Sequence, residues 1–185
     1  MSLGGSRRPL WAAFAALAVT VVVLDQLTKA WLVSVLAPGQ SMQVVGDLVR
    51  LVHSQNTGGL FGLLRGQAAP FAVLSVGVMV LIVVYHARSG RSAYLTLTLG
   101  LLLGGAIGNM LDRVRLGYVV DFVDAGIGGI RWYTFNVADS AISLAILLLV
   151  AAALRPSLIE PPPAQTPEPG STGAPAADAP STDRA

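Results

Sequence analysis

The sequence predicts an all-α integral membrane protein with four transmembrane helices, a small strand-containing segment outside the membrane and a disordered C-terminal tail. Its 185 residues are 54% hydrophobic and only 12% charged, which is far more apolar than a soluble domain. The apolar residues form four long blocks, each close to the roughly 20 residues that cross a bilayer. Residues 156–185 are rich in Pro, Ala, Ser, Thr and Gly and cannot bury a core, so we expect them to be disordered.

The four blocks indicate one membrane domain over residues 1–155. Its expected spans lie at about 10–37, 68–87, 92–111 and 132–154. The first block could be mistaken for a cleaved signal peptide. However, its apolar run continues past Asp25 to Ala37 without a clear small-x-small cleavage site, so a retained helix is the better interpretation.

Basic residues in the connections predict the orientation. The regions before the first span, between the second and third, and after the fourth hold Arg7, Arg8, Arg88, Arg91 and Arg155. Four spans put these regions on one side, and the positive-inside rule makes that side, with both termini, cytoplasmic. The segments 38–67 and 112–131 then lie outside. The first is rich in β-branched residues and should form one or two short strands, and "GYVVDFVDAG" in the second is also strand-like.

Polar residues gather at one level of this predicted bundle. This topology brings the outer half of span one, the outer end of span three, the start of span four and both outer segments close to the outer interface. Polar residues beside membrane spans are candidates for function, because their desolvation must be compensated. The candidates are Asp25, Lys29, Asn56, Asn109, Asp112, Arg113, Asp121, Asn136 and Asp139.

Two carboxylates in this set can perform acid–base chemistry on a water molecule. A close pair splits its titration, so that one group stays protonated while the other accepts a proton. Asn136 and Asp139 are three residues apart and share a helix face, with Asp139 in the first turn, where the helix dipole favours an anion. This aspartic-protease chemistry needs no metal, cofactor or cysteine, and the chain has no cysteine.

Other catalytic sites have less support. A serine–lysine dyad would have to use Lys29, the single lysine, with Ser34 or Ser54. Zinc is disfavoured because His53 and His86 fall on opposite sides of the predicted membrane and no HExxH motif is present. The net charge of +2 is too small and dispersed to indicate nucleic-acid binding.

Structural roles remain open for several of the acidic residues. Asp112 is interpreted as part of an ion pair or cap with its neighbour Arg113, and Asp25 can pair with Lys29 four residues later. Asp124 would point away from Asp121 in an extended segment and is interpreted as a turn residue. Membrane-embedded carboxylates also occur in proton-coupled transporters, which is the main alternative function, and a non-catalytic scaffold is a third.

Four ordered blocks resemble a known family. They are "DQLTK" at 25–29, "NTGGLFG" at 56–62, "GGAIGNMLDRVRLGYVVDFVD" at 104–124 and "FNVADSAI" at 135–142. Together they cover about residues 24–149 and resemble lipoprotein signal peptidase, also called signal peptidase II, an intramembrane aspartic peptidase of bacteria. One departure is visible, because the family usually has alanine after "NTG", where this chain has Gly59 and Leu60.

The resemblance implies an activity and a set of site residues. The catalytic aspartates would be Asp121 and Asp139, and the supporting or substrate-contacting residues would be Asp25, Lys29, Asn56, Gly58, Asn109, Asp112, Arg113 and Asn136. The enzyme would remove the signal peptide from a prolipoprotein just before a diacylglyceryl-modified cysteine. We expect a monomer in the bacterial inner membrane, in contact with membrane lipid and lipid-modified substrates, with its site near the extracytoplasmic face and Phe61 and Trp132 at the interface.

Overall fold

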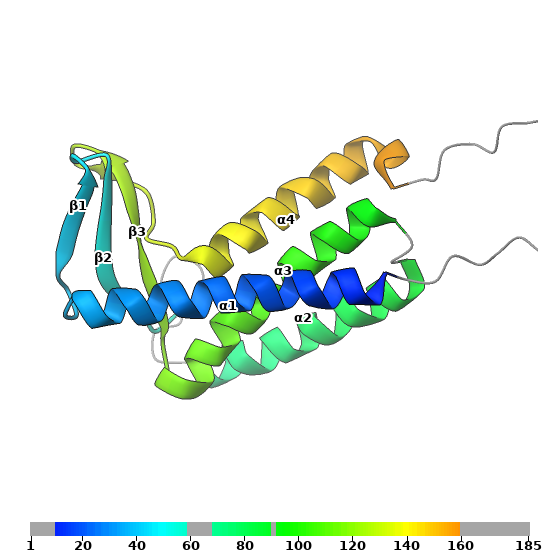
Figure 1. The fold of residues 1–185 in the computed structure, drawn as a ribbon, viewed down its shortest axis with the longest axis horizontal. Coiled ribbons are helices and arrows are strands. Elements are labelled where there is room, and N and C mark those ends of the chain that lie inside the picture. Colours follow the sequence, from blue (N-terminus) through cyan, green and yellow to red (C-terminus); the bar gives the residue numbers. More distant parts are fainter. Residues whose placement is uncertain (1–9, 59–67, 90–91, 160–185) are drawn as a thin grey trace, which may run out of the picture.

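A computed structural model describes residues 10–58, 68–89 and 92–159 of the chain. Its helices lie side by side along the long axis, and a small sheet stands at one end of them (Figure 1). The helices are α1 (Trp11–Val35), α2 (Ala68–Ser89), α3 (Ala93–Leu116), α4 (Val137–Leu154) and the short η2 (Pro156–Leu158). The strands are β1 (Ser41–Val45), β2 (Val49–Asn56), β3 (Val119–Ile127) and β4 (Ile130–Arg131).

Within the described residues, three of the four predicted spans, α1, α3 and α4, have the length and composition to cross a membrane. In α2, which has 22 residues, the stretch Val73–Ser89 is apolar. Large apolar side chains point outward from the helices, including Leu27, Leu81 and Leu147 with exposed fractions of 63%, 69% and 67%. Such surfaces are favourable against lipid and unfavourable against water. Of the tail predicted to be disordered, residues 156–185, the structure describes 156–159, where Pro156–Leu158 form η2, and residues 160–185 lie outside the described residues.

Two helix boundaries differ from the predicted ones. α3 continues to Leu116, past the expected end near residue 111, and stops where Gly117 adopts a left-handed φ of 79°. α4 begins at Val137, later than the expected residue 132, because Asn136 caps it. The Asn136 side chain accepts from the backbone N–H of Asp139 at 2.8 Å, and the Asp139 carboxylate accepts from the N–H of Asn136 at 3.3 Å. This reciprocal capping box defines the start of the helix.

The strands form one antiparallel sheet in the order β1-β2-β3-β4. The strands predicted in both outer segments are therefore confirmed, but the all-α description is not, because strands from both segments pair with each other. In this register Ser54 lies opposite Asp121. Val120 and Phe122 on β3 pack on the buried Leu32 of α1, which attaches the sheet to the end of that helix.

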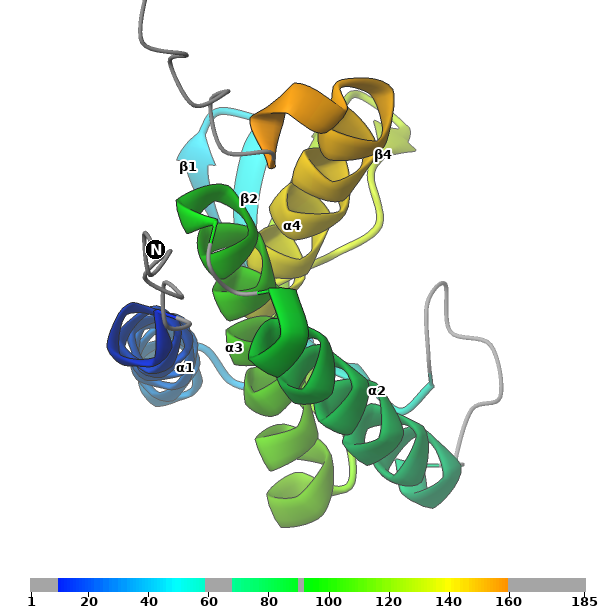
Figure 2. The same ribbon diagram turned by 90° about the vertical axis from the view of Figure 1, so that its right-hand side faces the viewer.

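Helix α3 is the central helix and packs against α1, α2 and α4, as the end-on view shows (Figure 2). A methyl group on Gly105 would lie 2.5 Å from the carbonyl oxygen of Ala138 in α4. Small residues let helix backbones approach closely where the hydrophobic effect does not drive packing. The close approach of α3 to α4 brings the polar ends of both helices together.

Candidate active site

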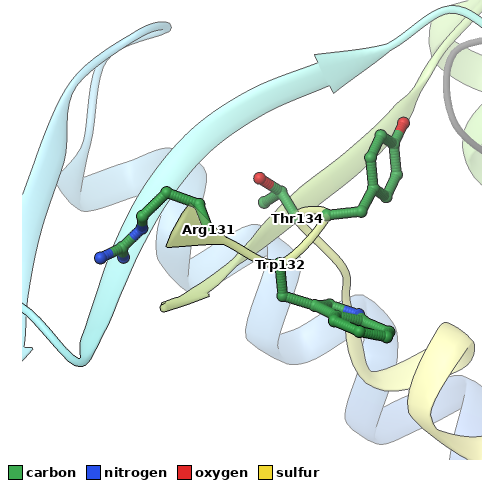
Figure 3. A pocket seen from close by; sticks show the side chains of 4 residues that line it. Arg131, Trp132 and Thr134 are labelled. Atoms are coloured by element: carbon green, nitrogen blue, oxygen red, sulfur yellow. The ribbon is translucent and has the colours of Figure 1, made fainter. Parts of the chain in front are cut away.

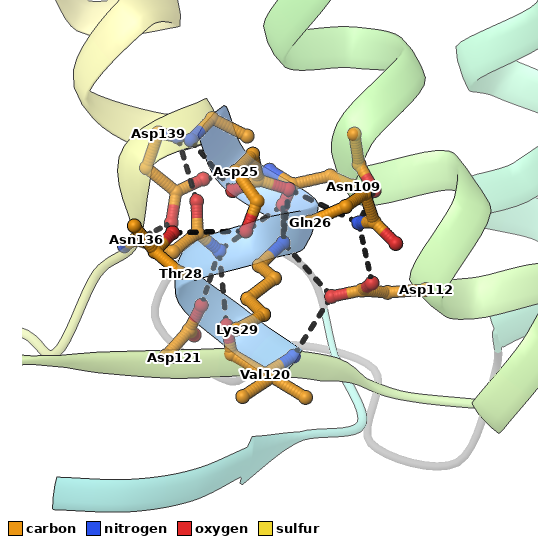
Figure 4. Close-up of polar contacts among 12 residues, drawn as sticks. Asp25, Gln26, Thr28, Lys29, Asn109, Asp112, Val120, Asp121, Asn136 and Asp139 are labelled. Atoms are coloured by element: carbon orange, nitrogen blue, oxygen red, sulfur yellow. Dashed lines mark hydrogen bonds and ion pairs between the residues drawn. The ribbon is translucent and has the colours of Figure 1, made fainter. Parts of the chain in front are cut away.

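The polar residues converge where the sheet meets the helices. They come from α1, α3, β3 and the start of α4, and their side chains point toward one another (Figure 4). Most are almost fully removed from solvent, with the partly exposed Asp139 as an exception. The buried members are Asp25, Lys29, Asn109, Asp112, Asp121 and Asn136.

Asp121 lies in β3, and both of its carboxylate oxygens accept hydrogen bonds from side-chain amides. Asn136 Nδ2 donates to Oδ1 at 2.7 Å, and Asn56 Nδ2 donates to Oδ2 at 3.0 Å. Asn56 is itself oriented by the backbone N–H of Gly58, which donates to its Oδ1 at 3.1 Å. The cap of α4 and the last residue of β2 therefore hold this carboxyl group from two sides.

Asp139 lies in the first turn of α4. Its Oδ1 accepts from Asn109 Nδ2 at 2.7 Å, and its Oδ2 accepts from the backbone N–H of Asn136. Asn136 Nδ2 also donates to Asn109 Oδ1 at 3.1 Å. The two asparagines thus connect Asp121 and Asp139 through a continuous series of hydrogen bonds, and each amide nitrogen faces an oxygen of its neighbour.

The surroundings of Asp121 favour its protonated form. Burial and, after it, the negative charge of Asp139 together raise the pKa of Asp121 to about 7, against the opposing effect of the amides of Asn56 and Asn136. A carboxyl group that keeps a proton near neutral pH can act as an acid, and a second carboxylate beside it can act as a base. The pair can therefore supply both functions that the hydrolysis of an amide bond requires.

A buried ion-pair cluster lies beside the two aspartates. Lys29 Nζ is 2.7 Å from Asp25 Oδ2 and 2.8 Å from Asp112 Oδ2, and it donates to Asn109 Oδ1 at 3.3 Å. The predicted pairing of Asp25 with Lys29 is confirmed. Asp112 does form an ion pair, but its partner at 2.8 Å is Lys29, from another helix, and not the predicted Arg113. The sequence neighbour Arg113 instead donates to the carbonyl oxygens of Asn109 and Gly58, at 3.3 and 3.4 Å.

Comparison with known proteins assigns the chain to a family. The sequence profile described as signal peptidase (SPase) II matches residues 17–155, which include all the residues of this cluster. The chain belongs to the signal peptidase II family. It is 37% identical to the lipoprotein signal peptidase of Halothermothrix orenii over 130 residues, which cover 70% of this chain and 87% of that protein. It is 42% identical to that of Geobacillus kaustophilus over 134 residues, covering 72% and 87%.

Solved structures agree with the family assignment. A bacterial membrane enzyme determined by the in meso method at 2.3 Å resolution superposes with a TM-score of 0.77 at 28% identity, covering 82% of this chain and 93% of that one. A second, at 1.9 Å resolution, gives 0.74 at 29% identity, covering 80% and 97%. The chain is therefore a bacterial membrane protein with the hydrolase character of signal peptidase II, and the transporter alternative has no support.

One acidic residue of the signal peptidase II motif has a different role from the predicted one. Asp124 is not a turn residue, because it lies within β3, where its carboxylate pairs with Arg131 Nε at 3.0 Å and Arg50 Nη2 at 2.8 Å. The hydrogen bond from Arg131 and that from Arg50 hold the pKa of Asp124 below its usual value. Asp124 is three positions from Asp121 on an extended strand and so faces the other way, as predicted.

Sequence reasoning missed one side chain of the site. Gln26 Nε2 donates to Asp112 Oδ1 at 2.9 Å and to Asp25 Oδ2 at 3.2 Å. Its position beside Asp25, in a short polar stretch of an apolar helix, was the available signal. The interfacial position predicted for Phe61 lies outside the described residues.

The other catalytic arrangements considered from sequence gain no support from the described residues. The Ser34 hydroxyl donates to its own helix, at Trp31 O, while Lys29 contacts carboxylates. His53 lies on β2 with Nδ1 2.8 Å from Leu36 O. His86 lies on α2 and stacks on the Phe14 ring of α1. Within residues 10–58, 68–89 and 92–159, no group of three His, Cys, Asp or Glu side chains is arranged to hold a metal ion.

A surface hollow lies apart from the buried cluster. It is lined by Arg131, Trp132, Tyr133 and Thr134, on the segment that leads from the sheet to α4 (Figure 3). The Trp132 side chain is 72% exposed. Indole rings are favourable at membrane interfaces, and the interfacial position of Trp132 stays a prediction.

Proposed function

We propose that the chain removes signal peptides from prolipoproteins, cutting before a diacylglyceryl-modified cysteine, with Asp121 and Asp139 as its catalytic dyad. The observation that carries the dyad is the pairing of a buried carboxyl group with a partly exposed one through Asn136 and Asn109. The substrate class follows from the names of the relatives, which are lipoprotein signal peptidases.

The different surroundings of the two aspartates support different roles for them. Asp121, with a pKa of about 7, carries the proton and donates it to the carbonyl oxygen of the scissile peptide bond. Asp139, the more exposed group, removes a proton from the attacking water, whose oxygen bonds to the carbonyl carbon. Collapse of the resulting gem-diol breaks the C–N bond. The proton on Asp139 passes to the leaving amine, and a hydroxyl proton of the gem-diol returns to Asp121, which restores both groups.

We further propose that all four helices span the membrane and that both termini are cytoplasmic. The length of α1, α3 and α4 and the apolar surface of α2 support this topology. It assigns the sheet and the dyad to the extracytoplasmic side, where a membrane-inserted signal peptide ends. A substrate that is itself a helix joined to a lipid can reach the site sideways, through the membrane. We expect a monomer to suffice, because one chain supplies the whole cluster.

Three matched aspartate variants test this proposal. Purified wild type, Asp121→Asn, Asp139→Asn and Asp124→Asn would each be incubated with a prolipoprotein that carries diacylglycerol on its cysteine and with the same precursor unmodified. Cleavage is expected only of the modified precursor, and only by wild type and Asp124→Asn. Asp124 is the control because it has the same chemistry, lies on the same strand and faces away from the site. Cleavage by either dyad variant would refute the catalytic assignment.

A further inference from the structure

The backbone on the N-terminal side of Asp139 is held by a carboxylate from α1. The residue before it, Ala138, is fully buried, and its N–H donates to Asp25 Oδ1 at 2.9 Å. This N–H belongs to the first turn of α4, where amides have no partner within the helix. Asp25 therefore holds the first turn of α4, which contains Asp139, in a fixed position relative to α1.

The backbone before Asp121 is held in the same way from α3. The residue before it, Val120, is also buried, and its N–H donates to Asp112 Oδ2 at 3.1 Å. A hydrogen bond from a backbone N–H to a carboxylate is charge-assisted and stronger than one between neutral groups. Asp112 therefore determines where β3, and with it Asp121, lies relative to α3.

Two side chains of α1 tie these two carboxylates to each other. Lys29 Nζ contacts Oδ2 of both Asp25 and Asp112, and Gln26 Nε2 donates to Asp25 Oδ2 and to Asp112 Oδ1. Asp112 is thus held at both oxygens, so its carboxylate cannot rotate without breaking a contact. Lys29 alone, on a flexible stem, would hold only one oxygen of each.

The orientation of the Gln26 amide is determined by its neighbours. Its Oε1 accepts from Arg115 Nη1 at 3.1 Å, so its Nε2 faces the two carboxylates. The reverse orientation would put the amide oxygen against two carboxylates and the NH₂ group against a guanidinium. A neutral amide with two N–H groups is well suited to bridge two anions without adding charge.

We infer that Gln26 is a positioning residue of the peptidase, which cross-links Asp25 and Asp112 and thereby sets the separation of Asp121 and Asp139. This inference rests on the proposed dyad. Besides Asp25 and Asp112, Gln26 Nε2 donates to Gly108 O of α3 at 3.4 Å. It therefore acts on the dyad indirectly, through α3 and through the two carboxylates and the backbone amides that they hold.

A looser cross-link should change the coupling between the dyad carboxyl groups. Activity requires one carboxyl group protonated and the other ionised, so the basic limb of the kcat–pH profile reports loss of the proton. If the groups separate, their repulsion weakens and the basic limb moves to lower pH. The charged side chains that act on the dyad from the surrounding elements are Lys29 and Asp25 from α1 and Arg113 from α3. Neither Gln26→Met nor Arg115→Met, described below, removes any of them.

Gln26→Met tests this inference, because methionine has a similar volume and no N–H donors. With a diacylglyceryl-modified prolipoprotein as substrate, kcat is expected to fall at least about 10-fold, since a displacement of about 1 Å can cost about 100-fold. KM should change less than about twofold, and the basic limb should move to lower pH. Thr20→Val is the control, because the Thr20 hydroxyl donates only to Ala16 O of the same helix.

If Gln26→Met keeps the wild-type kcat and the wild-type position of the basic limb, the inference is overturned. A lower kcat with an unmoved limb would also overturn it, since a loss of folded protein scales the rate without shifting the profile. If Gln26→Met does not fold, Arg115→Met replaces it, because Arg115 is exposed and orients the amide. Its limb should move the same way, and an unmoved limb would refute the inference. Asp121→Asn, run in parallel, separates the two proposals: cleavage by that variant refutes the dyad itself.

Discussion

Replacing Lys29 with methionine should strongly destabilise the fold. The ammonium group is within 2.8 Å of Asp25 and Asp112 carboxylate oxygens, and all three side chains are at most 4% exposed. Methionine has about the same length but no charge and no donor. Lys29→Met would therefore leave two carboxylates facing each other in a site that excludes water.

The magnitude follows from the contacts that remain. Breaking a buried ion pair by removing one partner costs about 3–5 kcal/mol, because the other charge stays buried and uncompensated. Here two carboxylates lose their cation, but each keeps one backbone donor, from Ala138 or Val120, and shares the amide of Gln26. We therefore expect a loss within that range, which lowers the ratio of folded to unfolded protein by a factor of roughly one hundred to a few thousand.

The free energy of unfolding would be measured in mixed micelles titrated with a denaturing detergent. Leu27→Met is the control, because Leu27 lies two positions away on α1 and is 63% exposed. The double variant Lys29→Met with Asp112→Asn should be more stable than Lys29→Met alone, since it removes one of the two uncompensated charges. A loss under about 1 kcal/mol for Lys29→Met, or no recovery in the double variant, would refute the assignment of Lys29 as the counter-ion of both carboxylates.

Two further predictions concern stability. Because the pKa of Asp121 is raised to about 7 in the folded protein from an ordinary value of 3.8, the folded state binds more protons between these values, so stability should fall as pH rises from about 4 to 7. Asp121→Asn cannot ionise, so a stability–pH slope in this window equal to that of wild type would contradict the assignment. Gly108→Ala should cost about 1–3 kcal/mol, because the added methyl would lie 2.8 Å from Asp25 Oδ2, whereas Gly77→Ala, with nothing within 4 Å, should cost nothing. Thermal unfolding of the two alanine variants checks this, and equal midpoints would mean that α1 and α3 are not in close contact there.

Local pattern was enough to predict most of the elements of the fold. Apolar runs long enough for a bilayer gave the four helices, and the β-branched segments on either side of α2 and α3 gave the strands. The helix ends were less accurate. Helix α3 ends just before Gly117, but its apolar run ends several residues earlier. Helix α4 begins after Asn136, but its apolar run begins before that residue. Composition indicates which residues lie within the membrane, but it does not indicate how far the helix itself extends.

Pairing between distant segments could not be predicted from local pattern. Asp124 is in a glycine-containing stretch typical of a turn, yet the pairing of β2 with β3 puts Arg50 beside it and keeps it in the strand. The partner of Asp112 is Lys29, on another helix, rather than its sequence neighbour. The energy of such contacts depends on burial and on distances across the fold, and neither has a local signature.

The sequence therefore predicts the chemistry of the site but not its geometry. A chain without cysteine, with acidic residues beside apolar helices and four family motifs in order, is enough to predict a membrane aspartic peptidase and to name Asp121 and Asp139. Only the packing of α1, α3, β3 and α4 shows that Asp25 and Asp112 hold the backbone before each of them and that Gln26 and Lys29 join the two. Residue types specify which reactions are possible, whereas the separation of two carboxyl groups is set by contacts among segments that are distant along the chain.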